Sequence, residues 1–295
     1  MKRFDVIVIG AGPAGEALAG RLAAQDRSVA IVESDLVGGE CSYYSCMPSK
    51  ALLRPAQALA ETLRVPGAAQ AVHGDLDVSA ALARRDGIVG HLDDAGQVPW
   101  LESRGIELIR GHGRLVGERR VGVRQEVYVA GDAVVIAVGS AAALPPIPGL
   151  QQAAPWTNRE ITTTEATPAR LVILGGGVAG VEMADAFNSL GSAVTLIEAE
   201  KRLIGREEPF ASEELRQALA ERGVDVRLGV RAEHVSRDST GVHIVLSNRA
   251  EVDGDEIFVA VGRRPLTEDL GLETVGLEPH GFIAVNDQLQ VPGVP

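Results

Sequence analysis

The chain contains one supersecondary pattern twice, and this repeat constrains the fold more than any other feature. Residues 6–33 read VIVIGAGPAGEALAGRLAAQDRSVAIVE, and residues 171–198 read LVILGGGVAGVEMADAFNSLGSAVTLIE. The two segments align without a gap at a constant offset of 165 residues. Each has a short apolar run typical of a buried parallel strand, a G-x-G-x-x-G turn, an amphipathic stretch and a second apolar run ending in an acid. A period of this length excludes a solenoid and indicates an α/β unit used twice.

The glycines and the acid of each copy have the spacing of a Rossmann-type dinucleotide site. The first glycine permits a tight strand-to-helix turn, the second lets the backbone approach a pyrophosphate, and the third lets helix and strand pack closely. The helix N-terminus offers N–H groups to phosphates, and the acid accepts hydrogen bonds from a ribose diol. Two glycine-rich turns without a ligand are the alternative, but two copies in the same context favour two bound dinucleotides. The residues are Gly10, Gly12, Gly15 and Glu33, then Gly175, Gly177, Gly180 and Glu198.

Composition excludes several classes of protein. Forty acids against 28 bases give a net charge of -12, which argues against a nucleic-acid partner. No apolar run approaches the roughly 18 residues that a membrane span needs. The charged start, Met1 to Asp5, is read as the first strand of a cytoplasmic protein and not as a signal peptide. The six histidines form no cluster with the cysteines, so we predict no metal site.

Two cysteines, Cys41 and Cys46, are too few to form a disulfide framework. They are either two buried free thiols or a short-loop redox disulfide. On an ideal helix their Cα atoms would lie about 8–9 Å apart, whereas a disulfide needs about 4.4–6.8 Å. A bridge therefore requires a departure from helical backbone, which we expect from Gly39 before the pair and Pro48 after it. So short a loop stabilises by only about 2 kcal/mol, so beside two nucleotide units the redox interpretation is favoured.

Three further segments carry a family resemblance. They are GGECSYYSCMPSK at 38–50, AVGS at 137–140 and VAVGRRP at 259–265. With the two glycine turns, they make essentially the whole chain resemble the class I pyridine nucleotide–disulfide oxidoreductases, such as dihydrolipoamide dehydrogenase, glutathione reductase and mercuric reductase. This chain departs from the family pattern at Glu40, where threonine is common, and at Tyr43 and Tyr44 between the cysteines. The electron acceptor therefore does not follow from the resemblance.

The resemblance implies an α/β architecture of two nested Rossmann-like, three-layer domains with a small β-meander. The FAD-binding domain is expected at 1–149 and 266–295, with the NAD(P)-binding domain of 150–265 inserted in it. The meander is expected at 106–115, 121–129 and 133–138, a helix at about 51–63, and a further helix at about 209–222. The family's C-terminal dimerisation domain, which makes the full-length homodimer, is absent from the sequence, so we expect an incomplete enzyme.

The implied activity passes hydride from NAD(P)H through FAD to a Cys41–Cys46 disulfide, and on to a small-molecule disulfide or related acceptor. Cys46 would be the flavin-proximal thiol, Cys41 the interchange thiol, and Lys50 would lie near the flavin and pair with Glu182. The alternative is a truncated dinucleotide-binding module that is non-catalytic or has only diaphorase or quinone-reductase activity.

The motifs and the resemblance together imply a set of cofactor-binding residues. Glu198 favours NAD(H) over NADP(H), because a carboxylate accepts hydrogen bonds from a free ribose hydroxyl and repels a 2′-phosphate. Lys201 and Arg202, just beyond it, soften that preference. The set is Gly10, Gly12, Pro13, Ala14, Gly15, Glu33, Gly39, Lys50, Gly113, Val138, Gly139, Ser140, Gly175, Gly177, Val178, Ala179, Gly180, Glu182, Glu198 and Gly262.

Overall fold

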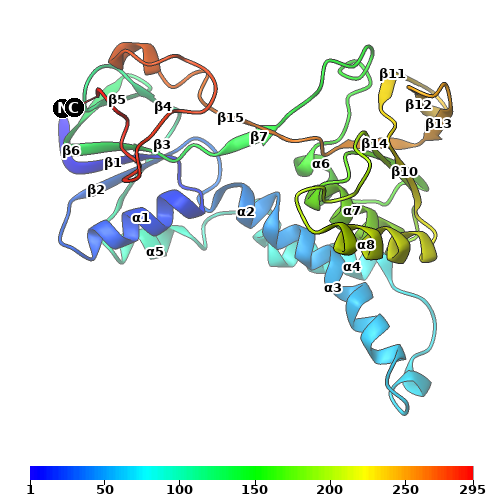
Figure 1. The fold of residues 1–295 in the computed structure, drawn as a ribbon. Helices are drawn as coiled ribbons and strands as arrows, with labels where there is room; N and C mark the ends of the chain where they lie inside the picture. Colours follow the sequence, from blue (N-terminus) through cyan, green and yellow to red (C-terminus); the bar gives the residue numbers. More distant parts are fainter. Residues whose placement is uncertain (295) are drawn as a thin grey trace. The chain divides into compact units, whose positions relative to one another are not determined.

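The computed structural model describes residues 1–294, which divide into two compact units (Figure 1). The first unit comprises Met1–Tyr43, Gly90–Ala141 and the chain from Arg263 onward, and the second comprises Tyr44–Val89 and Ala142–Gly262. Each unit contains one copy of the repeat. Strands β7 (Ser140–Ala142) and β15 (Arg263–Pro265) pair with each other at the positions where the chain leaves and re-enters the first unit.

The first unit is built on a six-stranded sheet. Strand β1 pairs in parallel with β2 and β6, and β2 pairs in parallel with β3, whereas β6, β5 and β4 pair antiparallel. The strand order is β3 (Glu107–Arg110), β2 (Val29–Glu33), β1 (Lys2–Ile9), β6 (Glu126–Ile136), β5 (Arg120–Val123) and β4 (Gly113–Leu115). The helical segments are α1 (Pro13–Ala23), α2 (Gly39–Tyr43), η2 (Gly90–Leu92), α5 (Val98–Glu102) and η3 (Leu272–Val275).

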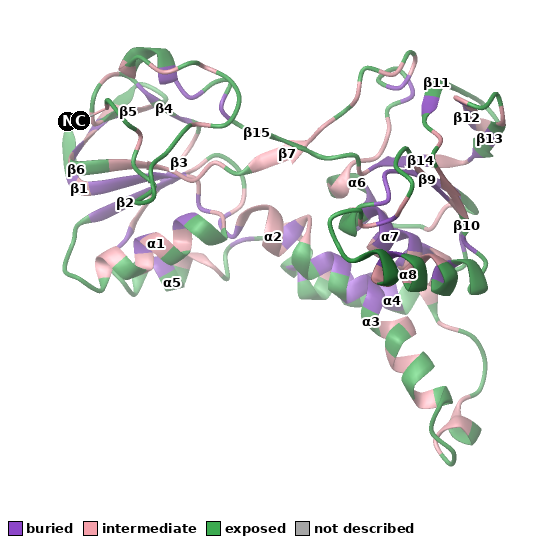
Figure 2. Cartoon of the chain, viewed as in Figure 1, coloured by how far each residue is buried: buried purple, intermediate pink, exposed green. Residues whose placement is uncertain are grey.

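Side-chain alternation in β1 explains the layers of this unit. Ile7 and Ile9 belong to the core cluster shared with residues of the antiparallel strands β4 to β6. Val6 and Val8 belong to the opposite cluster, shared with residues of α1 and α5. Because successive strand residues point to opposite faces, an uninterrupted apolar run buries both faces of the sheet. Figure 2 shows β1 as a largely buried strand.

The antiparallel part of the sheet differs in detail from the three predicted runs. The first run is divided at Gly111, whose φ is 141°, into a parallel strand β3 and an antiparallel strand β4. The second run is interrupted after Val123 by a tight turn in which Arg124 has a φ of 54°. The end of the second run and the third run then form the single long strand β6. Alternating hydrophobicity marks extended chain, but it does not show where a strand changes partner.

The second unit repeats the same three layers. Its parallel sheet runs β10 (Asp225–Leu228), β9 (Ala193–Glu198), β8 (Arg170–Leu174) and β14 (Glu256–Val259). A separate antiparallel sheet contains β11 (Ala232–Asp238), β12 (Gly241–Leu246) and β13 (Glu251–Gly254). In β8, Leu171 and Ile173 face the helical core, whereas Val172 and Leu174 face the core shared with β11 to β13. The predicted α/β class with two Rossmann-like units is confirmed, and the predicted domain limits stay a prediction.

The helices of the second unit begin and end near the expected residues, with one exception. Helix α8 starts at a proline and is followed by Gly223, whose φ is 92°, as expected for its two ends. Helix α3 starts five residues before the predicted Ala51, because Pro48 lies in its first turn, where the missing N–H is not needed. The helices are α3 (Cys46–Leu63), η1 (Ala69–Ala71), α4 (Val78–Ile88), α6 (Asn158–Thr163), α7 (Val178–Ser189) and α8 (Pro209–Glu221). Within residues 1–294, none is both long and apolar enough to cross a membrane.

Candidate cofactor and redox sites

The outer glycines of the two turns have the same geometry. Gly10 and Gly175 have φ values of 105° and 108°, which L side chains rarely adopt. A Cβ on Gly15 would lie 2.0 Å from the carbonyl oxygen of Gly10, and a Cβ on Gly180 would lie 1.8 Å from that of Gly175. These positions therefore accept only glycine, and the packing of helix on strand explains why.

The middle glycines of the two turns border free space. A Cβ built on Gly12 or Gly177 meets no heavy atom within 4 Å. Each is the N-cap residue of its helix, α1 or α7, and neither helix has a side-chain cap. The first-turn N–H groups therefore border an open space that a side chain would fill, which fits a pyrophosphate at each helix N-terminus.

Glu33 at the end of β2 and Glu198 at the end of β9 each accept a hydrogen bond from the glycine turn of the same copy. The N–H of Ala11 donates to Glu33 Oε2 at 2.7 Å, and the N–H of Gly176 donates to Glu198 Oε2 at 2.5 Å. The other carboxylate oxygen accepts the N–H two residues further along the chain, at 2.7 Å and 2.8 Å. Both carboxylates are thus oriented toward the turns before any ribose binds.

A cleft of about 340 Å³ lies beside the first glycine turn. Of the predicted cofactor residues, it is lined by Gly10, Glu33, Gly113 and Val138. None of its remaining polar residues was predicted to bind a cofactor, although Arg264 lies in the VAVGRRP segment and Ser34 directly follows Glu33. These remaining polar residues are Ser34, His112, Arg264, Glu268 and Asp269.

A larger cleft of about 1050 Å³ lies beside the second turn, close to the usual upper size of a small-molecule site. The predicted residues that line it are Gly175, Gly177, Val178, Ala179, Glu198 and Gly262. Lys201 and Arg202 also line it, as do Arg206 and Arg231, which the sequence did not indicate. The cleft therefore combines the carboxylate expected to bind a ribose diol with four basic side chains and two further acids, Glu200 and Glu207.

Glu16, in the first turn of α1, has an unusual protonation equilibrium that the motif did not indicate. Burial, and then the charge of Glu33, raise the pKa of Glu16 to about 7. At neutral pH this carboxyl group is therefore about half protonated. It places less negative charge beside the N-terminal end of α1 than an ordinary glutamate would.

Both cysteines are disulfide-bonded, and as the chain has only two, they bond to each other. Cys41 lies in α2, and Cys46 is the first residue of α3. The expected departure from helical backbone occurs at Ser45, with φ −140° and ψ −95°. Pro48, expected to help break the helix, instead lies within the first turn of α3. A helix interruption between the cysteines, and not one after them, permits the bridge.

Lys50 and Glu182 form an ion pair within the second unit. Lys50 Nζ lies 2.5 Å and 2.6 Å from the two carboxylate oxygens of Glu182. Lys50 projects from α3 and Glu182 from α7, and these helices pack on each other. The helix that begins with Cys46 is thereby attached to the helix of the second glycine turn.

Glu40, where the family pattern differs, also has a charged partner. Arg263 Nη2 lies 3.2 Å from Glu40 Oε2, and its Nε donates to Ser140 Oγ at 2.8 Å. Arg263 also donates to the Ser140 carbonyl. The guanidinium offsets the additional negative charge next to Cys41, and it holds the predicted cofactor residue Ser140.

The remaining predicted residues do not line either cleft. Gly15 and Gly180 pack helix against strand, and Gly39 lies at the start of α2, where a Cβ would come within 2.8 Å of Gly12. Within residues 1–294, no group of three or more His, Cys, Asp or Glu side chains is arranged to hold a metal ion. The other predicted residues outside both clefts are Gly12, Pro13, Ala14, Lys50, Gly139, Ser140 and Glu182.

Comparison with known families agrees with this geometry. The model of the family described as pyridine nucleotide-disulphide oxidoreductase matches residues 4–295. This chain belongs to that family. A pyridine nucleotide-disulphide oxidoreductase is expected to have two dinucleotide sites and a cysteine pair, and the chain contains residues suited to each. The family thus accounts for the repeat and for both cysteines.

Relatives of this chain carry names that refer to different substrates. It is 36% identical to dihydrolipoyl dehydrogenase of Thermus scotoductus, covering 100% of this chain and 65% of the relative. It is 30% identical to mercuric reductase of Staphylococcus aureus, covering 97% of this chain and 53% of the relative. The Cu(II) complex of RclA, an HOCl-induced flavoprotein disulfide reductase from Escherichia coli, has a TM-score of 0.82 at 27% identity, covering 99% and 62% of the two chains. The chain thus spans between about half and two thirds of the length of these relatives.

Proposed function

We propose that this chain carries the FAD- and NAD(H)-binding parts of an oxidoreductase that reduces a Cys41–Cys46 disulfide. The main support is the attachment of α3, which begins with Cys46, to α7 of the second glycine turn through Lys50 and Glu182. The first unit would bind FAD beside Gly12, and the second would bind NAD(H) beside Gly177. The limits 1–149 with 266–295, and 150–265, are part of this proposal.

The chemistry balances as a two-electron reduction. NADH, one proton and the disulfide give NAD⁺ and two thiols, and the thiols would then reduce a small-molecule disulfide or related acceptor. FAD, when bound, supplies the route by which the two electrons pass from nicotinamide to sulfur. Cys46, at the N-terminus of α3, is placed where the helix dipole favours a thiolate, and Cys41 would attack the acceptor. In the whole protein, this activity would be that of a cytoplasmic homodimer.

The proposed coenzyme is NAD(H). Glu198 lines the larger cleft, and its carboxylate is held by two backbone N–H groups, where it would accept hydrogen bonds from a ribose diol. The basic residues of the same cleft, such as Lys201 and Arg202, reduce the repulsion of a 2′-phosphate. We therefore expect NAD⁺ to bind more tightly than NADP⁺. In Glu198→Gln the ratio of the NADP⁺ Kd to the NAD⁺ Kd should be smaller, and calorimetric titration measures both constants.

The two dinucleotide assignments are tested by filling each open space separately. A Cβ at Gly12 or Gly177 meets no heavy atom within 4 Å, and both residues have φ values that any residue adopts, so Gly12→Val and Gly177→Val are expected to fold. Gly12→Val should lose flavin retention and keep NAD⁺ binding, and Gly177→Val should do the reverse. Flavin absorbance after purification and calorimetric titration with NAD⁺ provide the two measurements. Loss of the same ligand in both variants would contradict the assignment.

The redox role of the cysteines is tested by counting thiols. Anaerobic NADH should expose two titratable thiols in the flavin-loaded chain and none in Gly177→Val, which serves as the control. NADH oxidation that proceeds only when a quinone is added, with no new thiols, would instead indicate a dinucleotide-binding module with only diaphorase activity.

A further inference from the structure

The first turn of α3 has no N-cap side chain, although Ser49 Oγ donates to the Cys46 carbonyl oxygen at 3.2 Å and Lys50 pairs with Glu182. Its N-cap residue, Ser45, makes no side-chain capping hydrogen bond and has φ −140° and ψ −95°. The first i to i−4 hydrogen bond runs from Ser49 N to Ser45 O at 3.0 Å, and Pro48 has no N–H to contribute. A helix start of this kind is held by contacts from elsewhere, or it frays. This turn begins with Cys46.

Further contacts hold Tyr44, the residue before the N-cap. The side-chain amide of Asn158 donates to the carbonyl oxygen of Tyr44 at 3.0 Å. The guanidinium carbon of Arg159 lies 4.1 Å from the centroid of the Tyr44 ring. One residue thus fixes the backbone of Tyr44 and the next fixes its ring. Together they hold the chain immediately before Ser45.

Asn158 and Arg159 are suited to this role because the short helix α6 is held at both ends. At its start, Thr157 and Glu160 form a capping box, in which the N–H of Thr157 donates to Glu160 Oε2 at 2.7 Å. At its end, a fully buried Arg85 donates to the carbonyl oxygens of Thr162 and Thr164 at 3.0 Å and 2.9 Å. These bonds satisfy carbonyl groups that a helix end otherwise leaves unpaired.

We propose that Asn158 and Arg159 are positioning residues for Cys46. By holding Tyr44, they keep the first turn of α3 helical, so that the Cys46 thiol stays at the N-terminal end of the helix dipole. That location lowers the pKa of a thiol and favours the thiolate. The importance of these residues for catalysis rests on the proposed function. Their effect on the position and pKa of the Cys46 thiol does not.

The test measures how the rate of Cys46 alkylation depends on pH. It uses a Cys41→Ser background, in which Cys46 carries the one remaining thiol. Arg159→Ala and Tyr44→Ala should move the midpoint upward, toward the ordinary thiol pKa of about 8.5, and slow iodoacetamide alkylation at neutral pH roughly 3- to 10-fold. Because the two residues act through one contact, Arg159→Ala combined with Tyr44→Ala should add little to either change alone.

A matched control separates positioning from general loss of stability. Arg104 stacks on Trp100 at the same distance of 4.1 Å, away from the cysteines in sequence, so Arg104→Ala removes an equivalent stack. It should leave the Cys46 profile unchanged. All variants are compared at equal flavin content, and urea unfolding confirms that each is folded.

Three outcomes would overturn the proposal. They are an unchanged profile in Arg159→Ala, an equal shift in Arg104→Ala, and full retention of the profile in Arg159→Lys, which keeps the charge without the planar stack. Failure of the proposed function looks different. In that case NADH would release no thiols from the chain with both cysteines, while the alkylation profiles would still depend on Arg159 and Tyr44.

Discussion

Glycines at two helical positions of the second unit face opposite physical constraints. At Gly180 in α7, a Cβ would lie 1.8 Å from a carbonyl oxygen of the preceding strand turn. At Gly87 in α4, a Cβ would meet nothing within 4 Å. The first glycine is required by packing. The second only costs helix stability, because glycine loses more conformational freedom on folding than alanine.

Alanine substitution at these two positions should therefore have opposite effects. Gly180→Ala forces backbone to move and should lower the free energy of unfolding by about 1–3 kcal/mol or more. Gly87→Ala should raise it by about 0.5 kcal/mol, because the change relieves an entropic cost without any clash. Urea unfolding of both variants beside the unchanged chain measures the difference. A destabilisation of equal size at both positions would contradict this interpretation of the glycine turn.

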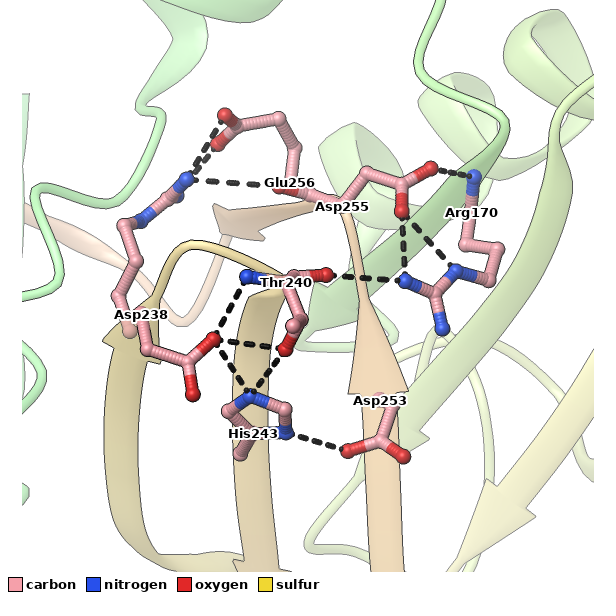
Figure 3. Close-up of polar contacts among 8 residues, drawn as sticks. Arg170, Asp238, Thr240, His243, Asp253, Asp255 and Glu256 are labelled. Carbon is pink, nitrogen blue, oxygen red and sulfur yellow. Dashed lines mark hydrogen bonds and ion pairs between the residues drawn. The ribbon is translucent and has the colours of Figure 1, made fainter.

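At the scale of the elements, one histidine adds side-chain contacts across the sheet of β11, β12 and β13 (Figure 3). His243 on β12 contacts Asp253 on β13 through Nδ1 at 2.7 Å, and Asp238 at the end of β11 through Nε2 at 3.2 Å. The hydrogen bonds to Asp253, and then to Asp238, raise the pKa of His243 above 6.5. The bond from Thr240 is the first cause that lowers the pKa of Asp238 to about 2, and the aspartate therefore remains charged at neutral pH.

The raised pKa predicts how His243 contributes to stability as pH changes. The folded state binds the proton more tightly than the unfolded state, so the stabilisation is fully present below the unfolded pKa. It is lost as pH rises through the folded value. The difference in unfolding free energy between the unchanged chain and His243→Gln should therefore be larger at about pH 5.5 than at about pH 8.5, and smaller in high salt. Urea titrations at both pH values provide the measurement, and a difference independent of pH would contradict the prediction.

At the scale of the whole molecule, the arrangement of the hydrophobic cores determines how the chain unfolds. The first unit has two core clusters, one on each face of its sheet, and so does the second. Each unit also contains one of the two tryptophans, Trp100 in the first and Trp156 in the second. A unit with its own buried faces is able to unfold on its own, and the tryptophans report on the two units separately.

We expect two unfolding transitions that respond to different ligands. In Trp156→Phe the fluorescence of Trp100 follows the first unit, and in Trp100→Phe that of Trp156 follows the second. On the proposed assignment, NAD⁺ binds only the folded second unit, so at about 100 times its Kd it should stabilise that unit by about 2.7 kcal/mol. It should not change the midpoint of the Trp100 transition. Coincident transitions that NAD⁺ shifts together would show that the chain unfolds as one cooperative unit.

The sequence by itself determined the local features of this protein. Glycine spacing, apolar runs and terminal acids act over fewer than 30 residues, so they predicted both turns, the two parallel strands of each copy and the α/β class. Short-range spacing also indicated that the cysteines needed a break in helical backbone, although the structure places the break at Ser45 and starts α3 at Cys46.

Only the tertiary structure decided which distant residues meet. Lys50 and Glu182 are 132 residues apart, Glu40 and Arg263 are 223 apart, and Tyr44 and Asn158 are 114 apart. The family resemblance indicated the first of these pairs, but no local pattern indicates the other two. Their meeting depends on how α3, α6 and the paired strands β7 and β15 pack. Packing sums many weak contacts over the whole chain, and so the residues that position Cys46 and offset the charge of Glu40 emerge only in the folded molecule.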